Sequence, residues 1–232
     1  MINGITIEMC IGNIDDALTV SKYPIDRIEL NSALELGGLS PNITTIKILK
    51  EKIDIPLCCM CRPRGGDFYY SELEYIEMIE NAKQMLEAKA DGIVFGFLDA
   101  NNNIDTKRSK EMIDLIHSYN KEAIFHKAFD EVNDLDEAIK QLIQLKVDRI
   151  LTSGKAIYPD ILEGCNRLND LNQKYGDQIE LLPGGGVRSD NVVDVLKISG
   201  LKQIHMTSKK STSYLCLDEI QLQEILSKIE SI

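Results

Sequence analysis

The chain has 232 residues, of which 44% are hydrophobic and 27% charged, a composition typical of a soluble globular protein. We expect a single domain over residues 1–232, and the formal net charge of −11 argues against a nucleic-acid partner, which would require a concentrated basic face. No stretch approaches the run of about 18 apolar residues that spans a membrane, and the first residues, MINGITIEMC, do not resemble a secretion signal, so we predict a cytoplasmic protein.

Short β-rich runs alternate with longer helical patterns along the whole chain. The predicted strands cover residues 4–10, 26–30, 55–60, 91–96, 122–126, 148–153, 179–183 and 202–206. Helix starts are indicated at Asn13, Ser71 and Ser189, whose side-chain oxygens can cap free backbone N–H groups, and Ser71 with Glu74 has the spacing of a capping box. The pattern predicts an α/β fold, a (β/α)₈ TIM barrel.

The barrel would place the functional site at the carboxyl ends of its strands. Alternate strand residues face the interior, so we expect charged side chains from distant parts of the chain to meet at this mouth. The expected acid, base and ion-pairing residues are Glu8, Glu29, Arg62, His126 and His205. Arg62 is the predicted partner of Glu29 or Glu8, since a guanidinium can hold a carboxylate through two hydrogen bonds. The alternative is a structural ion-pair network that fills the barrel.

Two glycine-containing loops are candidates for binding a small anion. The loop PGGGVRSDN leads from a predicted strand into a helix, and the backbone N–H groups of Gly184, Gly185 and Gly186 could cradle a phosphate or carboxylate. Ser153, after the preceding strand, could contribute to the same site. The alternative is that the glycines only make a tight turn.

The segment RPRGGDFYYS adds Arg64 and Asp67 as candidate ligand-binding residues. It has the composition of a lid or a substrate-gripping loop. The alternative is a solvated cluster of ion pairs.

Six cysteines occur without a secretion signal, so we expect reduced thiols. Cys59 and Cys61 share a strand face that we predict to be covered by helices, and the chain lacks a second cysteine pair with the spacing of a structural zinc site. Packing is therefore the expected role of this cluster.

Six blocks in order along nearly the whole chain resemble the CutC family of copper-homeostasis proteins: RIELNSALELGGLSPN, RPRGGDFYYSELE, ADGIVFGFL, FHKAFD, RILTSG and LPGGGVRSDN. The resemblance implies a (β/α)₈ barrel, a cytoplasmic homodimer and a role with Cu(I). The proposed copper site of some relatives has one cysteine in the first strand and a second directly after RIEL. Here the first is Cys10, but the second position is Asn31, and Lys127 stands where an arginine is usual.

Two functions follow from these observations. The first is Cu(I) binding or trafficking, with Cys10 as the metal ligand and with Met60, His126 or His205 as further ligands. The second is a TIM-barrel enzyme that uses acid–base chemistry on a small metabolite bearing a phosphate or carboxylate. No Walker loop or dinucleotide motif is present, so no nucleotide cofactor is expected.

Overall fold

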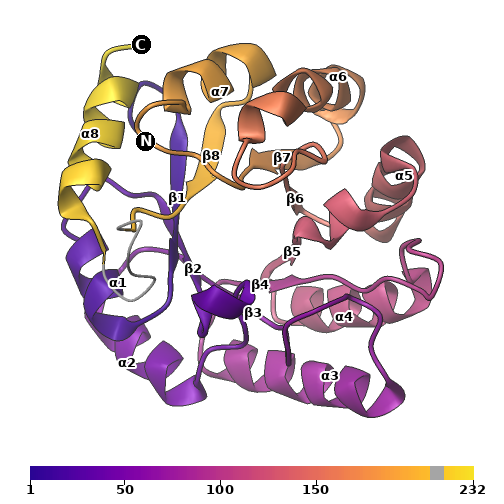
Figure 1. The fold of residues 1–232 in the computed structure, drawn as a ribbon. Coiled ribbons are helices and arrows are strands. Elements are labelled where there is room, and N and C mark those ends of the chain that lie inside the picture. The colour runs from indigo at the N-terminus through magenta and orange to yellow at the C-terminus, as the bar shows by residue number, and fades with distance from the viewer. Residues whose placement is uncertain (210–216) are drawn as a thin grey trace.

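Eight parallel strands form one sheet in the computed structural model, which describes residues 1–209 and 217–232 (Figure 1). The strand order is β7-β6-β5-β4-β3-β2-β1-β8, and a parallel bridge between Gly184 and His205 joins the two ends of the sheet. Helices surround the strands in a ring (Figure 1). The predicted (β/α)₈ barrel is therefore confirmed.

Each of the eight predicted strands is present, most of them a residue or two shorter than expected. The strands are β1 (Thr6–Ile11), β2 (Arg27–Leu30), β3 (Leu57–Met60), β4 (Gly92–Phe95), β5 (Glu122–Phe125), β6 (Arg149–Thr152), β7 (Glu180–Pro183) and β8 (Gln203–Met206). The helices are α1 (Ile14–Val20), α2 (Ile43–Lys52), α3 (Glu72–Glu87), α4 (Thr106–Ser118), α5 (Leu135–Leu145), α6 (Cys165–Tyr175), α7 (Val192–Ser199) and α8 (Glu219–Glu230). Three short 3₁₀ helices are η1 (Leu34–Leu36), η2 (Lys127–Glu131) and η3 (Ile161–Gly164).

Two of the three predicted helix starts are confirmed. Asn13 caps α1 by accepting from the N–H of Asp16, and Ser71 with Glu74 forms the predicted capping box of α3. The expectation for Ser189 is wrong, because α7 begins at Val192 after Asn191. The Asn191 side chain accepts from the N–H of Arg188 and donates to the carbonyl of Gly186, so it holds the glycine loop instead of capping the helix.

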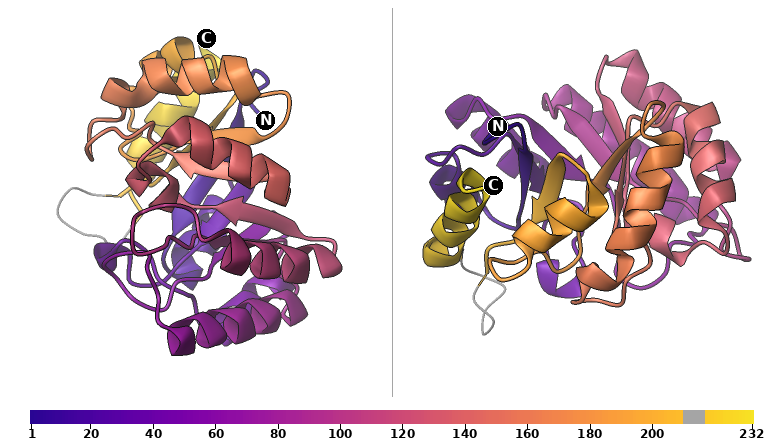
Figure 2. Two further views of the ribbon diagram at one scale, coloured as in Figure 1. Left: turned by 90° about the vertical axis from the view of Figure 1, so that its right-hand side faces the viewer. Right: turned by 90° about the horizontal axis from the view of Figure 1, so that it is seen from above.

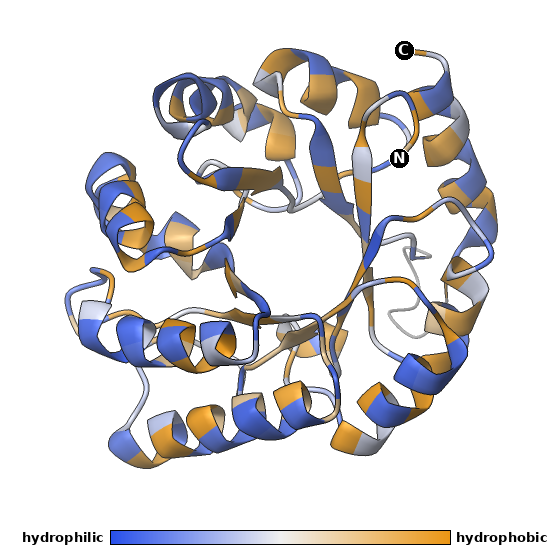
Figure 3. Ribbon diagram, turned by 180° about the vertical axis from the view of Figure 1, so that it is seen from behind, coloured by the Kyte–Doolittle hydropathy of each residue, from blue (hydrophilic) through white to orange (hydrophobic). Residues whose placement is uncertain are grey.

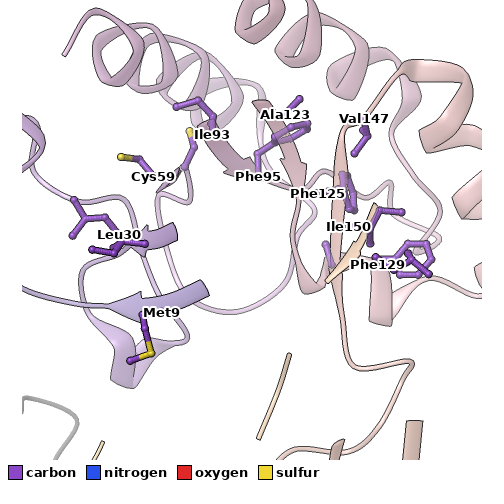
Figure 4. Close-up of a cluster of buried hydrophobic side chains, with 14 of the residues drawn as sticks. Met9, Leu30, Cys59, Ile93, Phe95, Ala123, Phe125, Phe129, Val147 and Ile150 are labelled. Atoms are coloured by element: carbon purple, nitrogen blue, oxygen red, sulfur yellow. The ribbon is translucent and has the colours of Figure 1, made fainter. Parts of the chain in front are cut away.

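The main core lies between the sheet and the helices. Buried hydrophobic side chains of the strands and of the helices form one cluster, and hydrophilic and hydrophobic residues alternate along the helices (Figure 3). Aromatic rings of neighbouring strands meet here, such as Phe95 and Phe125, whose centroids are 5.7 Å apart (Figure 4). Cys59 and Cys61 belong to this outer core, as predicted.

The interior of the barrel holds a much smaller apolar cluster. It consists of Cys58, Met60, Val94 and Ile124 from β3, β4 and β5. The side of the interior formed by β1, β2 and β8 is instead lined by buried polar groups, including Glu8, Glu29 and His205. A further buried charge, Arg149 of β6, lies elsewhere in the wall, where it pairs with Glu122 and Glu180.

The two ends of the described chain lie side by side (Figure 2). The Asn3 side chain donates to the carbonyls of Ile229 and Glu230 in α8. This contact and the pairing of β1 with β8 bring the first and last strands into the same wall of the barrel. None of the helices in the described residues is both long enough and apolar enough to cross a membrane.

Candidate metal centre

Three potential metal ligands converge at the carboxyl-terminal mouth of the barrel. Cys10, Glu29 and His205 come from β1, β2 and β8, and their ligand atoms all lie within 4.8 Å of one another. The strand register brings them together, because Cys10 is paired with Glu29 and Glu8 with His205. All three side chains are buried.

Two charged side chains beneath these groups, Glu8 and Arg27, orient His205. The Nδ1 atom of His205 lies 2.7 Å from Oε1 of Glu8, and the Nε atom of Arg27 donates to Oε2 of the same carboxylate at 2.5 Å. Burial alone would raise the pKa of Glu8, but the hydrogen bond with His205 and the charge of Arg27 outweigh burial and lower this pKa to about 2. Glu8 is therefore an anion at neutral pH. Its bond to Nδ1 leaves Nε2 as the nitrogen of His205 that could bind a metal, on a ring that also makes a side-chain hydrogen bond with Cys10.

Asn31 connects the other two ligands. Its Nδ2 atom donates to Oε1 of Glu29 at 2.8 Å and to the Sγ atom of Cys10 at 3.4 Å. The second carboxylate oxygen of Glu29 is buried without a hydrogen-bond partner among the described residues. Burial raises the pKa of Glu29, and although the charge of His205 opposes this, the charge of Glu8 adds to it. Burial also raises the pKa of the Cys10 thiol.

Cys10 and His205 lie in the wall of a cavity of about 810 Å³. Lys127, Gly185 and Arg188 form another part of its lining. A volume of this size is sufficient for a small organic molecule, since ligand pockets commonly measure about 300–1,000 Å³. Two of the three candidate ligands, Cys10 and His205, are therefore accessible from this cavity, whereas Glu29 lies behind its wall.

Arg62 does not partner either carboxylate, contrary to the prediction. Its guanidinium donates to four backbone carbonyls in the neighbouring loops, those of Leu36, Gly37, Gly38 and Gly66. The physical reason is that β3 ends at Met60, so Arg62 lies in the loop above the strand and reaches across the mouth. The cation that binds Glu8 is Arg27, which faces the interior from within β2.

His126 lies in a separate cluster with Phe68 and Arg62. The rings of His126 and Phe68 are 4.8 Å apart between centroids, and the Arg62 guanidinium lies 4.9 Å from the Phe68 centroid. The Nδ1 atom of His126 accepts from the N–H of Ala128, and Nε2 is buried without a hydrogen-bond partner among the described residues. Burial and the nearby charge of Arg62 lower the pKa of His126 to about 3. The histidine is thus neutral at pH 7.

The buried neutral state of His126 predicts a pH-dependent stability. Its folded-state pKa of about 3 lies below the ordinary value of 6.5, so the unfolded chain binds the extra proton and stability falls as the pH drops from 6.5 toward 3. Between pH 4.5 and 5.5 this residue should contribute up to ~1.4 kcal/mol per pH unit to the slope of unfolding free energy. Urea unfolding of His126→Phe should show a slope smaller by most of that amount. His117→Phe, at the surface, is the matched control, and parallel curves for wild type and His126→Phe would contradict the assignment.

Of the other predicted ligand-binding residues, only some line the cavity. Gly185 and Gly186 line it directly. Gly184 forms the bridge to His205, and an added Cβ there would approach the His205 side chain to 3.0 Å. Ser153 is buried and is held by Asp130, which accepts from both its N–H and its hydroxyl group. The Ser153 hydroxyl is therefore engaged within the protein.

Arg64 and Asp67 form an ion pair at the surface. Their side chains are 36% and 73% exposed, and Arg64 also pairs with Glu74 at the start of α3. Neither residue lines the 810 Å³ cavity. The segment is a partly solvated salt-bridge cluster, the alternative that the sequence left open.

Several important residues were not identified from the sequence. Arg27 could have been found, because it lies two residues before Glu29 and therefore shares its strand face. The sequence comparison marks Asn31 only as the position of an absent cysteine. Its side-chain amide has two N–H donors, however, and these can satisfy buried acceptors. No sequence motif marks Asp130 as important. In the structure its carboxylate also accepts from the Thr152 hydroxyl and the N–H of Lys155.

The described cysteines are all free thiols, as expected from the sequence. They are Cys10, Cys58, Cys59, Cys61 and Cys165, and all five are buried. Cys216 lies outside the described residues.

The chain matches the CutC family over residues 5–210. It is 40% identical to a CutC family protein of Treponema denticola over 206 residues, covering 89% of this chain and 82% of the relative. A CutC family protein of Mesorhizobium japonicum is 37% identical, with 88% of this chain and 78% of the relative covered. The crystal structure of a protein described as a candidate copper homeostasis protein CutC, from Streptococcus agalactiae, aligns with a TM-score of 0.80 at 34% identity over 87% of this chain and 97% of that chain.

More distant solved structures share the fold alone. N-(5'-phosphoribosyl)anthranilate isomerase from Pyrococcus furiosus aligns with a TM-score of 0.62 at 15% identity, over 98% of this chain and all of that chain. 3-Hexulose-6-phosphate synthase from Salmonella typhimurium aligns with a TM-score of 0.66 at 14% identity, over 98% and 99% of the two chains.

Proposed function

Because the chain belongs to the CutC family, we propose that it serves copper homeostasis by binding Cu(I) at Cys10, Glu29 and His205. The observation that carries this proposal is the convergence of these three buried side chains, whose ligand atoms lie within 4.8 Å of one another. Copper would be the cargo of the protein. The cytoplasmic location and the homodimer follow from the resemblance and stay predictions.

The donor set suits Cu(I). A thiolate and an imidazole are soft or intermediate ligands, and Cu(I) prefers such donors over carboxylates and water. Structural zinc sites instead use four nitrogen or sulfur ligands in a tetrahedron, whereas the cluster in the described residues has one thiol, one imidazole and one carboxylate. In this proposal Cys10 and His205 are the principal ligands.

The surrounding hydrogen bonds support the same assignment. Glu8 holds Nδ1 of His205, in the manner of the carboxylate–histidine–metal arrangements that fix ring orientation in many metal sites. Asn31 restrains both Cys10 and Glu29. The partnerless Oε2 atom of Glu29 is a buried acceptor that a bound cation would satisfy.

The alternative, acid–base catalysis on a small metabolite, has less support. That proposal requires two carboxylates and His126 around one cavity. Glu8 is instead paired with Arg27 and His205, and His126 lies against Phe68 with a neutral ring. The groups expected to exchange protons with a substrate are thus occupied by internal contacts or are away from the cavity.

Cu(I) titration in competition with a chromogenic chelator tests the proposal. Under anaerobic conditions wild-type protein should remove one Cu(I) per chain from the chelator, and Cys10→Ser should lose this binding because Cu(I) coordinates a hydroxyl oxygen poorly. Cys165→Ser is the matched control, since it removes a buried thiol whose Sγ atom contacts the carbonyl of Ile161. Binding of less than half an equivalent by wild type, or equal binding by Cys10→Ser, would refute the proposal.

A further inference from the structure

The 810 Å³ cavity has a second polar region that the copper ligands do not use. It is formed by Lys127 after β5 and by Gly185, Gly186 and Arg188 after β7. Lys209, which is 8% exposed, also lines the cavity, and the acidic residues in the lining are Glu35 and Asp218. Three of these five charged side chains are cations, in a chain where acidic residues outnumber Lys and Arg by 37 to 26.

The turn at Gly185 and Gly186 borders the cavity, with Gly185 partly exposed and Gly186 buried against the carbonyl of Pro159. Both residues have positive φ angles, +115° and +105°, which favour glycine. Neither N–H has a hydrogen-bond acceptor among the residues that the structure describes, although both residues line the cavity. Consecutive backbone N–H groups in such turns form concave sites for anions.

The Nζ atom of Lys127 lies directly over this turn. A Cβ atom added to Gly185 would lie 2.8 Å from Nζ and 3.3 Å from Cβ of Ser153, so the ammonium group lies close to the Gly185 backbone. Lys127 is also 3.9 Å from Oδ2 of Asp130, a distance longer than a hydrogen bond. Lys127 is thus ion-paired with Asp130 without a hydrogen bond to it, which leaves the N–H donors of Nζ for a ligand in the cavity.

The neighbouring loop is rigidly held. Asn191 bonds both the carbonyl of Gly186 and the N–H of Arg188, each at 2.8 Å. The Nη1 atom of Arg188 donates to the carbonyls of Val187 and Thr207. These two hydrogen bonds to the backbone position the guanidinium. A positioned guanidinium, an ammonium group and two adjacent N–H groups are the donors that hold a phosphate group.

We propose that the cavity binds a small organic phosphate, with the phosphoryl group between Lys127, the Gly185–Gly186 backbone and Arg188. The same cavity extends to Cys10 and His205, so the remainder of the molecule would lie toward the copper ligands. Phosphate is favoured over carboxylate because its oxyanion carries more charge and has more acceptor oxygens for these donors. This binding goes beyond the copper proposal and uses different residues.

Calorimetric titration of the metal-free protein tests this site. Inorganic phosphate and glycerol phosphate are the phosphate probes, and acetate is the carboxylate probe. We expect both phosphates to bind more tightly than acetate, and Lys127→Met to weaken phosphate binding about tenfold to hundredfold, the usual effect of losing a charge-assisted hydrogen bond. Lys155→Met is the matched control, because Lys155 does not line the cavity and its Nζ atom donates to the carbonyl of Asn133.

A second measurement needs no variant. In wild-type protein the amide resonances of Gly185 and Gly186 should shift on addition of phosphate at millimolar concentration. The proposal is overturned if these resonances do not move, if Lys127→Met binds phosphate as tightly as Lys155→Met, or if acetate binds as tightly as phosphate.

Discussion

Replacing Arg27 by methionine is expected to lower the free energy of unfolding by about 3–5 kcal/mol at pH 7. Arg27 and Glu8 are 9% and 2% exposed, and the Nε atom of Arg27 donates to the Glu8 carboxylate. Methionine would leave a buried anion supported by the hydrogen bond with His205 and by the charge of Arg149. Urea unfolding monitored by circular dichroism measures the difference.

Two companion variants separate the charge effect from the loss of packing. The double variant Arg27→Met/Glu8→Gln removes both charges and should recover a large part of the lost stability, because the buried anion is then absent. Arg64→Met removes an arginine with surface ion pairs whose guanidinium also donates to three carbonyls of its own loop, and its effect should be smaller than that of Arg27→Met because no buried anion is left unpaired. If Arg27→Met and Arg64→Met lowered the free energy of unfolding equally, the buried ion pair would contribute no more to stability than the surface ion pairs.

The same pair explains how the site is assembled. Lowering the pKa of Glu8 to about 2 keeps its carboxylate ionised through the physiological range, so the hydrogen bond to Nδ1 of His205 persists there. Glu8 contributes stability that is present above its unfolded pKa of about 4.5 and is lost as the pH falls toward 2. The ion pair between Arg27 and Glu8 thus stabilises the fold and also orients His205, a candidate copper ligand.

The sequence was sufficient for the fold because eight β-rich runs with helical patterns between them leave few topologies other than a closed barrel. It also placed Glu8, Glu29 and His205 on interior faces, since period-two alternation follows directly from strand geometry. The Nδ1 atom of His205 does lie 2.7 Å from Oε1 of Glu8 and 3.9 Å from Oε2 of Glu29. Strand alternation alone therefore located one wall of the site.

Partners could not be predicted in the same way. Alternation gives the face on which a side chain lies, but contacts across strands depend on register and on where each strand ends. Arg62 was expected to bind a carboxylate, but β3 ends two residues earlier, and Arg27 is paired in register with Glu8. Similarly, the residue before α7 is Asn191 and not Ser189, and the Asn191 amide donates to the glycine loop without capping the helix.

Asn31 is the residue whose role in the structure differs most from the role that the sequence indicates. By resemblance it occupies the position of a lost cysteine ligand. In the folded chain its Nδ2 atom donates to Cys10 and Glu29, while its Oδ1 atom is buried without a partner among the described residues. The Asn31 amide therefore restrains Cys10 and Glu29, two of the proposed ligands.

Replacing Asn31 by alanine is expected to weaken Cu(I) binding by about 10–100-fold, the usual effect of losing a hydrogen bond that orients a metal ligand. The fold should be retained, because the substitution also removes the partnerless Oδ1 atom. Asn31→Cys should have the opposite effect and bind Cu(I) more tightly than wild type, since it places a second soft thiolate beside Cys10.

Chelator competition on the three proteins gives the order of affinity, with Ser32→Ala as the local control. Ser32 follows Asn31 in the chain, but its hydroxyl donates to the carbonyl of Ser40 and does not contact the ligands. The expected order is Asn31→Cys, then wild type together with Ser32→Ala, then Asn31→Ala. If Asn31→Ala bound Cu(I) as tightly as wild type, the amide would have no positioning role, and if Asn31→Cys gained nothing, the metal would not lie between positions 10 and 31.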